Sequence, residues 1–343
     1  APIYTLVYDE RATGGVFKSR EIRTSFLQKL PFTRRHHRLF PLLMPLAIEQ
    51  FDFSEFDTVL SVSASFAKGI ITKPHTRHIN YCLTPTRFLW DESHRYLSDF
   101  HFPWPIRKLI PLFLTYLRLW DKEAALRVDD FVGISKFVQE RIKKYYEQGS
   151  ALIYPPVDTK KYYISNQVDD YFLMVGRLVG YKRFDLAVRA FSAMDLPLKI
   201  VGDGPMLGKL KAQSSKFKNI EFLGLVSDYK MPELYSHAQA VIFPQEEDFG
   251  LVPLESMASG RPVIAYRGGG ALETIVEGVT GIFFDRQTEI DISLAIGRFH
   301  QTRFDPQAIR RHAMKFDNSV FKEKVLQCIL ERDATAQRTI GFV

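Results

Sequence analysis

Two glutamates, Glu247 and Glu255, lie in a short acidic stretch that could bind a sugar or a nucleotide. Glu247 follows a predicted strand and precedes a predicted helix, so its carboxylate can face a ligand at the strand end. Glu255 lies eight positions on, inside that helix. A carboxylate accepts paired hydrogen bonds from neighbouring hydroxyls, which ribose and hexoses both carry. The alternative is structural, with Glu247 as a helix cap and Glu255 as an exposed surface residue.

Two helix starts in the same half of the chain could bind an anion. Gly250 and Leu251 would present backbone N–H groups where the helix that holds Glu255 begins. The loop from Gly176 to Arg183 opens another helix, and its Arg177 and Lys182 suit a phosphate. Two exposed basic residues on an ordinary loop would explain this second stretch equally well.

A third loop, Gly202-Asp203-Gly204-Pro205, follows the next predicted strand. It nearly matches the dinucleotide-binding fingerprint, but the third glycine, Gly208, comes one residue late. A near-match of this kind is weak evidence and disfavours a nicotinamide dehydrogenase. A tight turn without a ligand is the competing interpretation.

These loops are positioned by strands that alternate with helices. The apolar runs predict strands, and the helical spacing of apolar residues between them predicts helices. Single helices between strands indicate parallel βαβ units in a doubly wound sheet, with ligands at the carboxyl ends of the strands. The strands are predicted at 171–175, 198–201, 220–223, 240–243 and 262–265, and the helices at 183–194, 206–214, 229–237 and 251–259.

The first half repeats this pattern less clearly. Strands are predicted at 4–8, 58–61, 78–82 and 131–134, and helices at 19–30, 105–128 and 137–146. The helix at 105–128 contains Pro111 and has apolar residues nearly all round. That favours burial, although its basic residues keep contact with a membrane surface as the alternative. The segment Tyr154 to Asp158, with its Pro-Pro pair, predicts a linker between two α/β domains.

Composition excludes several classes of protein. The 46% hydrophobic and 25% charged residues are typical of a globular chain, and the longest uncharged apolar run, Leu109 to Leu117, is far shorter than the ~20 residues of a membrane helix. Two cysteines make neither a disulfide framework nor a zinc site, so a cytoplasmic location is expected. The net charge of +7 lacks the dense basic stripe of a nucleic-acid-binding protein. The basic cluster 34–38 is interpreted as a solvated loop, with an anionic membrane as the other option.

The second half resembles a known family. Glu247 to Glu255 has the E-x7-E spacing of retaining nucleotide-sugar glycosyltransferases of family 4, which have the GT-B fold. Val175-Gly176-Arg177 with Lys182, Val201 to Pro205, Phe222-Leu223-Gly224, Ser256 to Ala265 and Gly268 to Glu273 resemble further motifs of that family, in the same order. Tyr81 to Asp91 is similar to a motif of its WbaZ-type bacterial O-antigen mannosyltransferases.

The resemblance implies an architecture and a set of binding residues. The fold would be α/β, with two Rossmann-like domains facing across a cleft. Residues 1–158 plus 316–343 would form the acceptor-side domain, and residues 159–315 the donor domain. Glu247 would touch donor sugar hydroxyls, Glu255 the ribose, and Arg177 and Lys182 the diphosphate. The remaining binding residues would be Gly176, Gly202, Val226 beside the base, and Phe249, Gly250, Leu251 and Val252 through their backbone amides.

The chain departs from the family in two places. Many relatives carry His where this chain has Leu83, so a catalytic His cannot be transferred; His78 and His94 are nearby, but we interpret both as ordinary residues. The family also begins with a strand and a Gly-Gly loop, whereas residues 4–8 resemble its second strand. A missing first strand would expose both of its neighbours in the sheet. We therefore expect residues upstream of Ala1.

The reaction implied is transfer of a hexose with retention, without a metal or another cofactor. The expected donor is GDP-mannose and the expected acceptor a lipid-linked saccharide or oligosaccharide, as in polysaccharide or lipopolysaccharide synthesis at the inner face of the membrane. A UDP-hexose donor, an epimerase or phosphorylase on the same scaffold, and a nucleotide-sugar-binding protein with weakened catalysis are the alternatives.

Overall fold

The computed structural model describes residues 1–37, 40–91 and 104–336, and the chain divides into two compact units. The first unit comprises residues 1–134 and 138–152, and the second comprises residues 135–137 and 153–343. The start of helix α5 (Lys136–Tyr146) therefore belongs to the second unit and the rest of that helix to the first.

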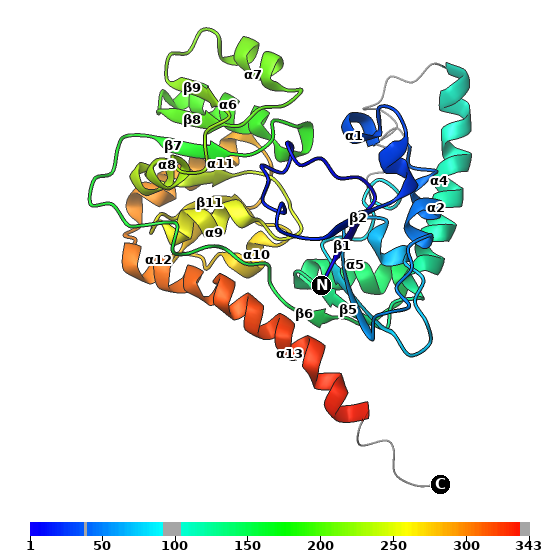
Figure 1. The fold of residues 1–343 in the computed structure, drawn as a ribbon. Coiled ribbons are helices and arrows are strands. Elements are labelled where there is room, and N and C mark those ends of the chain that lie inside the picture. Colours follow the sequence, from blue (N-terminus) through cyan, green and yellow to red (C-terminus); the bar gives the residue numbers. More distant parts are fainter. Residues whose placement is uncertain (38–39, 92–103, 337–343) are drawn as a thin grey trace. The chain divides into compact units, whose positions relative to one another are not determined.

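The second unit is built on six parallel strands in the order β12-β11-β10-β7-β8-β9 (Figure 1). The first strand of this unit, β7, lies inside the sheet because the chain winds outward from it in both directions. All six strands run the same way, so their carboxyl ends lie along one edge. The strands are β7 (Phe172–Val175), β8 (Leu198–Val201), β9 (Ile220–Gly224), β10 (Val241–Phe243), β11 (Val263–Tyr266) and β12 (Gly281–Phe284).

Helices cover both faces of this sheet. Helices α6, α7 and α11 pack together over one face, and their apolar residues form a continuous core with Phe172, Ile200 and Ile264 (Figure 1). Helices α8, α9 and α12 form the other group. The helices are α6 (Phe184–Met194), α7 (Leu207–Ser214), α8 (Met231–His237), α9 (Leu251–Ala258), α10 (Ala271–Thr274), α11 (Glu289–Gln301) and α12 (Pro306–Ala313), with the 3-10 helices η4 (Gly180–Lys182) and η5 (Met314–Phe316).

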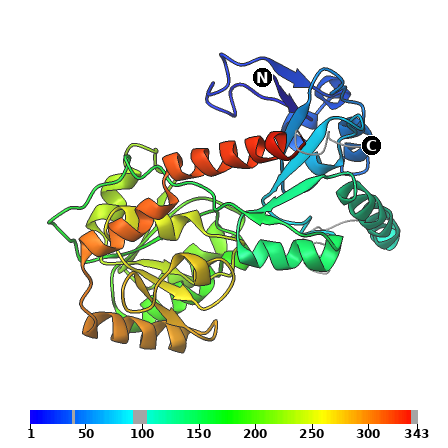
Figure 2. The ribbon, with the colours of Figure 1, turned by 90° about the horizontal axis from the view of Figure 1, so that it is seen from below.

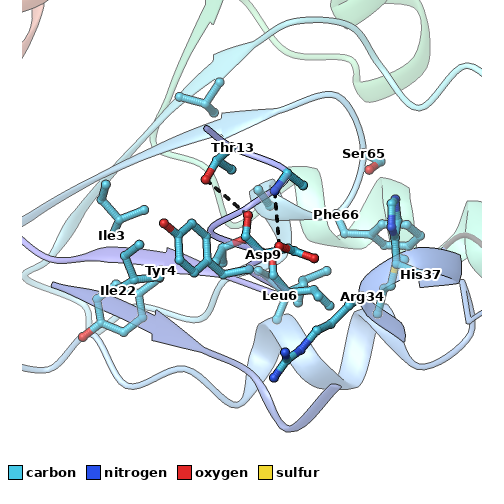
Figure 3. A pocket seen from close by; sticks show the side chains of 18 of the residues that line it. Ile3, Tyr4, Leu6, Asp9, Thr13, Ile22, Arg34, His37, Ser65 and Phe66 are labelled. Carbon is cyan, nitrogen blue, oxygen red and sulfur yellow. Dashed lines mark hydrogen bonds between the residues drawn. The ribbon is translucent and has the colours of Figure 1, made fainter. Parts of the chain in front are cut away.

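The first unit contains two separate parallel sheets, β1-β2 and β3-β4-β5-β6. Its strands are β1 (Ile3–Thr5), β2 (Ile22–Thr24), β3 (Thr58–Ser63), β4 (Arg77–Cys82), β5 (Asp130–Gly133) and β6 (Ala151–Leu152). Its helices are α1 (Thr33–His36), α2 (Met44–Glu49) and α4 (Trp104–Ala125), with the 3-10 helices η1 (Phe26–Lys29) and η3 (Ala67–Gly69). A cavity of about 660 Å³ lies in this unit, and its wall includes Ile3, Tyr4 and Leu6 from the β1 side and Ser65 and Phe66 from the loop after β3 (Figure 3).

The helix predicted at residues 19–30 is wrong. Ile22 and Thr24 are β-branched, and this segment pairs in register with β1 as strand β2. Ser25 then stops the strand, because its hydroxyl donates to the Leu6 carbonyl and accepts the Leu27 N–H that begins η1. The spacing of the apolar residues in this segment predicted a helix, but hydrogen bonding to β1 makes it a strand.

The long helix expected at 105–128 exists as α4, but the expectation that it is buried all round is wrong. Ile110, Leu114 and Leu117 are buried on one side of the helix. Five large apolar side chains on the opposite side are 38–67% exposed, namely Leu109, Leu112, Phe113, Tyr116 and Leu119. Their spacing of three and four residues places them in one stripe, which we call the α4 apolar face. Within the described ranges, no helix combines the length and hydropathy that crossing a bilayer requires.

Buried charges fix the inner side of α4. Lys68 and Asp121 are 2% and 0% exposed and form an ion pair at 2.5 Å. The Asp121 carboxylate also accepts hydrogen bonds from Thr86 Oγ1, Trp90 Nε1 and the Tyr146 hydroxyl at 2.6–2.9 Å. These donors compensate for the loss of water around the buried charge. They also attach the loop after β4 to the helix.

Two segments of the second unit, 157–159 and 316–319, are hydrogen-bonded to each other. The segment predicted as a linker pairs with the end of η5, since Val157 N donates to the Phe316 carbonyl at 2.9 Å. Asp317 accepts from Ser319 N at 2.9 Å, as an N-cap does, and binds Thr159 with its other oxygen. These hydrogen bonds lower the Asp317 pKa. The helix that follows, α13 (Asn318–Ala336), is long and continuous (Figure 2). The predicted packing of residues 316–343 on the first unit stays a prediction.

Candidate functional site in the second unit

The candidate site lies where β7 and β10 end side by side. The chain leaves β7 toward β8 and β9 on one side, while β10 to β12 occupy the other, so this is the switch point of the sheet. Loops after the two strands diverge at such a point and leave room for a ligand. The loop after β7 carries Gly176, Arg177 and Lys182, and the loop after β10 carries Glu247.

An ion pair joins these two loops. Lys182 Nζ lies 2.8 Å from Glu247 Oε1, and the two side chains are 14% and 19% exposed. Gln245, which is almost fully buried, donates from Nε2 to the same carboxylate oxygen at 3.3 Å. Within the described part of the chain, Glu247 Oε2 has no donor of its own. The structure thus brings two predicted residues together and holds the carboxylate with one oxygen still available.

Arg177 is exposed and, among the described residues, has no ion-pair partner. It lies one position after Gly176, whose Cβ position would come within 3.1 Å of Lys182 Nζ. Both predicted cations therefore belong to the short loop that leaves the switch point. Lys182 is the last residue of η4, and Arg183 follows with a left-handed backbone before α6 begins.

Close backbone packing shapes the neighbouring loops. A Cβ at Gly202 would lie 1.9 Å from the Gly176 carbonyl oxygen, and the φ of Gly202 is +135°. Only glycine fits such an approach, so Gly202 lets the loops after β7 and β8 touch. Gly270 has the same role near β10, since its Cβ would lie 2.2 Å from Phe249 Cα and its N–H donates to the Glu247 carbonyl at 2.8 Å.

The start of α9 holds four further predicted residues. Gly250 is the N-cap, with φ +93°, and Leu251 and Val252 form the first turn. The Phe249 side chain is buried and stacks on Tyr154 with ring centroids 5.5 Å apart. Only its backbone is therefore placed to meet a ligand. Val226 is partly buried in the loop after β9, at the same edge of the sheet.

Glu255 lies farther along α9, away from the ion pair. Its Oε2 accepts a hydrogen bond from the buried Tyr235 hydroxyl at 2.6 Å. Burial is the main cause that raises the pKa values of Tyr235 and Tyr162, and the Glu255 carboxylate adds to both increases. The interpretation of Glu255 as a free surface residue is wrong, because tyrosines orient its carboxylate. Its predicted contact with ribose stays a prediction.

Two further residues near the site, Gln245 and Glu273, were not predicted to have a role. The Glu273 carboxylate accepts the backbone N–H groups of Lys136 and Phe137, at 2.8 and 3.1 Å, and the Tyr154 hydroxyl. Ser135 donates to the Asp248 carbonyl at 2.5 Å, so the first turn of α5 is attached beside the Glu247 loop. The sequence gave one signal for each residue: Gln245 follows a predicted strand, and Glu273 ends the Gly268 to Glu273 motif and lies in α10.

Neither His78 nor Leu83 and Asp91 of the 81–91 motif provides a catalytic base in the described residues. His78 is fully buried, with Nε2 at 2.7 Å from Ser61 Oγ, and burial lowers its pKa to about 4. It is a core residue, as interpreted, while His94 lies outside the described residues. Leu83 is partly buried, and Asp91 in the same motif pairs with Arg141 and Tyr145.

The second unit is similar to known proteins. Residues 159–316 match the family model described as glycosyl transferases group 1. This segment is therefore similar to the group 1 glycosyltransferases. A GDP-mannose-dependent alpha-(1-6)-phosphatidylinositol monomannoside mannosyltransferase from Mycolicibacterium smegmatis is 30% identical over 55% of this chain and 56% of its own length. Other curated relatives named as mannosyltransferases are 24–32% identical. The chain spans about half the length of the first curated relatives it matches.

Solved structures show the fold of the whole chain. The sucrose-phosphate synthase of Thermosynechococcus elongatus aligns over 93% of this chain and 84% of its own, with a TM-score of 0.70 and 17% identity. Anabaena HepE in complex with UDP aligns over 93% of this chain and 89% of its own, with a TM-score of 0.64 and 16% identity. The chain has the GT-B fold, with two Rossmann-like domains, as predicted.

Proposed function

We propose that the chain is a retaining hexosyltransferase that moves mannose from GDP-mannose to a hydroxyl of a lipid-linked or oligosaccharide acceptor. The observation that carries this proposal is the Lys182–Glu247 ion pair at the switch point of a domain that is similar to the group 1 glycosyltransferases. It sets a cation suited to a diphosphate beside a carboxylate suited to sugar hydroxyls. Arg177 adds a second, exposed cation on the same loop.

In the proposed reaction, negative charge develops on the departing diphosphate. Lys182, Arg177 and the first amides of α9, at Gly250, Leu251 and Val252, would stabilise that charge. Glu247 would accept hydrogen bonds from donor sugar hydroxyls with the oxygen that Lys182 does not occupy. Glu255 would bind the ribose, with Val226 beside the base. These roles require no metal ion or other cofactor.

The choice of GDP-mannose rests on the curated relatives, one of which is named as GDP-mannose-dependent and shares 30% identity. It also rests on the resemblance to WbaZ-type enzymes. A UDP-hexose is the second candidate donor, since HepE, with the same fold, was solved with UDP. A nucleotide-sugar-binding protein with weakened catalysis is the third, because Leu83 replaces the His found in many relatives.

The decisive experiment offers labelled GDP-mannose, UDP-glucose and other sugar nucleotides to the purified protein, and measures hydrolysis and transfer. GDP-mannose turnover that is lost in Lys182→Ala but kept in Lys209→Ala supports the proposal, because Lys209 is an exposed lysine on α7. Proton NMR of the product then reads the anomeric configuration. Turnover of a UDP-sugar alone would show that the donor is a UDP-sugar. Binding of a sugar nucleotide without turnover would show that the protein is a nucleotide-sugar-binding protein and not an enzyme.

We also propose that the α4 apolar face rests on an anionic membrane, which would place the enzyme at the cytoplasmic surface of the bilayer beside a lipid-linked acceptor. Five exposed apolar side chains in one stripe are far more than isolated surface residues. Lys108 adjoins the stripe, and the charge of +7 favours anionic headgroups.

Vesicle flotation tests this second part. Wild-type protein is expected to float with vesicles that contain anionic lipid, and Leu112→Glu is expected to abolish this. Leu294→Glu is the matched control, because Leu294 is similarly exposed on α11 of the second unit. Equal flotation of both variants would show that α4 is not the contact surface, and donor hydrolysis without vesicles still tests the enzyme separately.

A further inference from the structure

Two buried tyrosines of the second unit meet the Glu255 carboxylate. The Tyr235 hydroxyl of α8 donates to Glu255 Oε2 at 2.6 Å. Burial is the main cause that raises the Tyr162 pKa, and interaction of the Tyr162 hydroxyl with the same carboxylate raises it further. Tyr235 and Tyr162 are 0% and 5% exposed, and their rings meet edge to face with centroids 5.7 Å apart. Two rigid side chains therefore hold Glu255 from the protein interior, while part of the Glu255 side chain is exposed.

Burial of the tyrosines does not by itself require a glutamate at this position. A buried hydroxyl needs a hydrogen-bond acceptor, and a backbone carbonyl is sufficient for this purpose. Tyr171, which is 4% exposed, donates to the Leu234 carbonyl of the same helix α8 at 2.8 Å. Tyr235 instead donates to a charged side chain, and such hydrogen bonds are stronger than neutral ones. The arrangement thus fixes the carboxylate as well as satisfying the tyrosine.

The position of Tyr162 is set by α12. Arg310 of this helix donates to the Tyr162 carbonyl at 2.7 Å and to the Thr159 carbonyl at 2.9 Å. The same guanidinium donates to the Ala258 carbonyl at the end of α9. Because a guanidinium is planar and presents its donors in a fixed geometry, it joins the segment 159–162 to the helix that carries Glu255. Tyr162 therefore meets Glu255 from a fixed backbone.

The Glu255 carboxylate still has room for a ligand. A carboxylate has about four acceptor positions, so two tyrosine hydroxyls leave roughly half of them open. A glutamate that rotates freely loses side-chain entropy when a ligand orders it. Tyr235 and Tyr162 restrict this rotation before a ligand arrives, which favours a ligand with hydroxyls at matching positions.

We propose that Tyr235 and Tyr162 are positioning residues that make the site selective for ribonucleotides, because they hold the Glu255 carboxylate where it accepts hydrogen bonds from the two ribose hydroxyls. This inference rests on the proposed function in one respect, namely that the donor is a nucleotide sugar whose ribose meets Glu255. It is independent of the base and of the hexose. A nucleotide without the two hydroxyls leaves the oriented carboxylate without a ligand donor and binds more weakly.

Titration calorimetry of the purified protein with GDP and with 2′,3′-dideoxy-GDP tests the proposal. The wild-type protein is expected to prefer GDP roughly tenfold, which is the lower limit for a hydrogen bond to a charged group. Tyr235→Phe and Tyr162→Phe should each reduce this preference to about threefold or less, through weaker binding of GDP and nearly unchanged binding of the dideoxy analogue. A purely structural loss would weaken both ligands equally and leave their ratio unchanged.

Tyr171→Phe is the matched control. It removes a hydroxyl from a tyrosine that is about as buried as Tyr235 and is bonded to the same helix, but it leaves Glu255 and both of its tyrosines in place. Thermal unfolding should show similar losses of stability in Tyr171→Phe and Tyr235→Phe, because each loses one buried hydrogen bond. The preference for GDP should fall only in Tyr235→Phe. An equal fall in Tyr171→Phe would show a general loosening of α8 and overturn the proposal.

The same titrations separate failure of this inference from failure of the proposed function. A wild-type protein that binds neither GDP nor UDP would refute the proposed function, and this inference with it. Binding of GDP with a preference that persists in both Tyr235→Phe and Tyr162→Phe would keep the proposed function and refute the positioning role. Equal wild-type affinity for GDP and its dideoxy analogue would refute ribose recognition by Glu255, whichever base the natural donor carries.

Discussion

The Lys182–Glu247 pair gives the sharpest test of the candidate site, because substitution of Lys182 and substitution of Glu247 should affect stability and nucleotide binding differently. The pair is mostly buried, at 14% and 19% exposure, with N and O 2.8 Å apart. It thus lies between an exposed pair, worth about 0–1 kcal/mol, and a fully buried one, whose disruption costs roughly 3–5 kcal/mol. Lys182→Ala leaves Glu247 with the neutral Gln245 donor at 3.3 Å, so we expect a loss of about 2 kcal/mol in the free energy of unfolding.

A double-mutant cycle isolates the pair from the rest of the site. Glu247→Gln keeps the size of the side chain and removes its charge, and the double variant should recover about 1–2 kcal/mol relative to the sum of the single changes. Urea unfolding followed by circular dichroism measures each free energy. Additivity within about 0.5 kcal/mol would refute the reasoning, because the two side chains would then not interact in solution.

Binding separates the two proposed roles. Lys182→Ala removes one charge-assisted contact to the diphosphate, worth about 1.5–3 kcal/mol, so GDP affinity should fall roughly 10- to 150-fold. Glu247→Gln releases Lys182 from its carboxylate, and GDP affinity should hold or rise, while mannosyl transfer falls roughly 100-fold through loss of sugar orientation. Isothermal titration and initial rates measure both quantities, with Lys209→Ala as the control. Equal loss of GDP affinity in both variants would contradict the separate roles.

Three other outcomes follow from the same structure. Glu255→Ala should weaken GDP and UDP binding by about the same factor, roughly tenfold, because ribose is common to both; titration with each nucleotide checks this. Transfer should persist in EDTA, and its loss would contradict a metal-independent reaction. His78 has a pKa of about 4 when folded against 6.5 unfolded, so only the unfolded chain gains this proton between those values, and stability should fall as pH falls through that window. The loss should reach roughly 3 kcal/mol at pH 4 and be smaller in His78→Asn, as measured by urea unfolding.

The second unit was predictable because local and long-range signals agree there. Each predicted strand is a short apolar run, and each helix between strands has one apolar face that packs on the sheet. Where an element was predicted, its observed bounds lie within two residues of the predicted ones: β8 (Leu198–Val201) agrees at both ends, and α6 (Phe184–Met194) begins one residue later. Sequence order alone then brings the loops of Lys182 and Glu247 to one edge, because the strands of such units are parallel.

The first unit was less predictable because neighbouring strands decide its structure. The segment Ile22–Thr24 has helical spacing around it, yet pairing with β1 makes it a strand. Helix α4 was predicted correctly as a helix, but composition could not show that only one of its two apolar sides meets the core. Nor can spacing identify the buried Lys68–Asp121 pair, whose members lie 53 positions apart. Contacts of this kind depend on the tertiary fold.

The E-x7-E spacing has a physical meaning that the structure makes visible. Glu247 lies in the loop before α9 and faces Lys182, whereas Glu255 lies after the first turn of α9 and faces Tyr235 of α8. Between them come Gly250, Leu251 and Val252, where the helix begins and its dipole favours an anion. In the proposed roles, the order along the chain would be sugar contact, phosphate contact and ribose contact, which is the order of these groups along a nucleotide sugar. A spacing one or two residues shorter would turn the second carboxylate to another side of the helix, since each residue rotates the helix by about 100°.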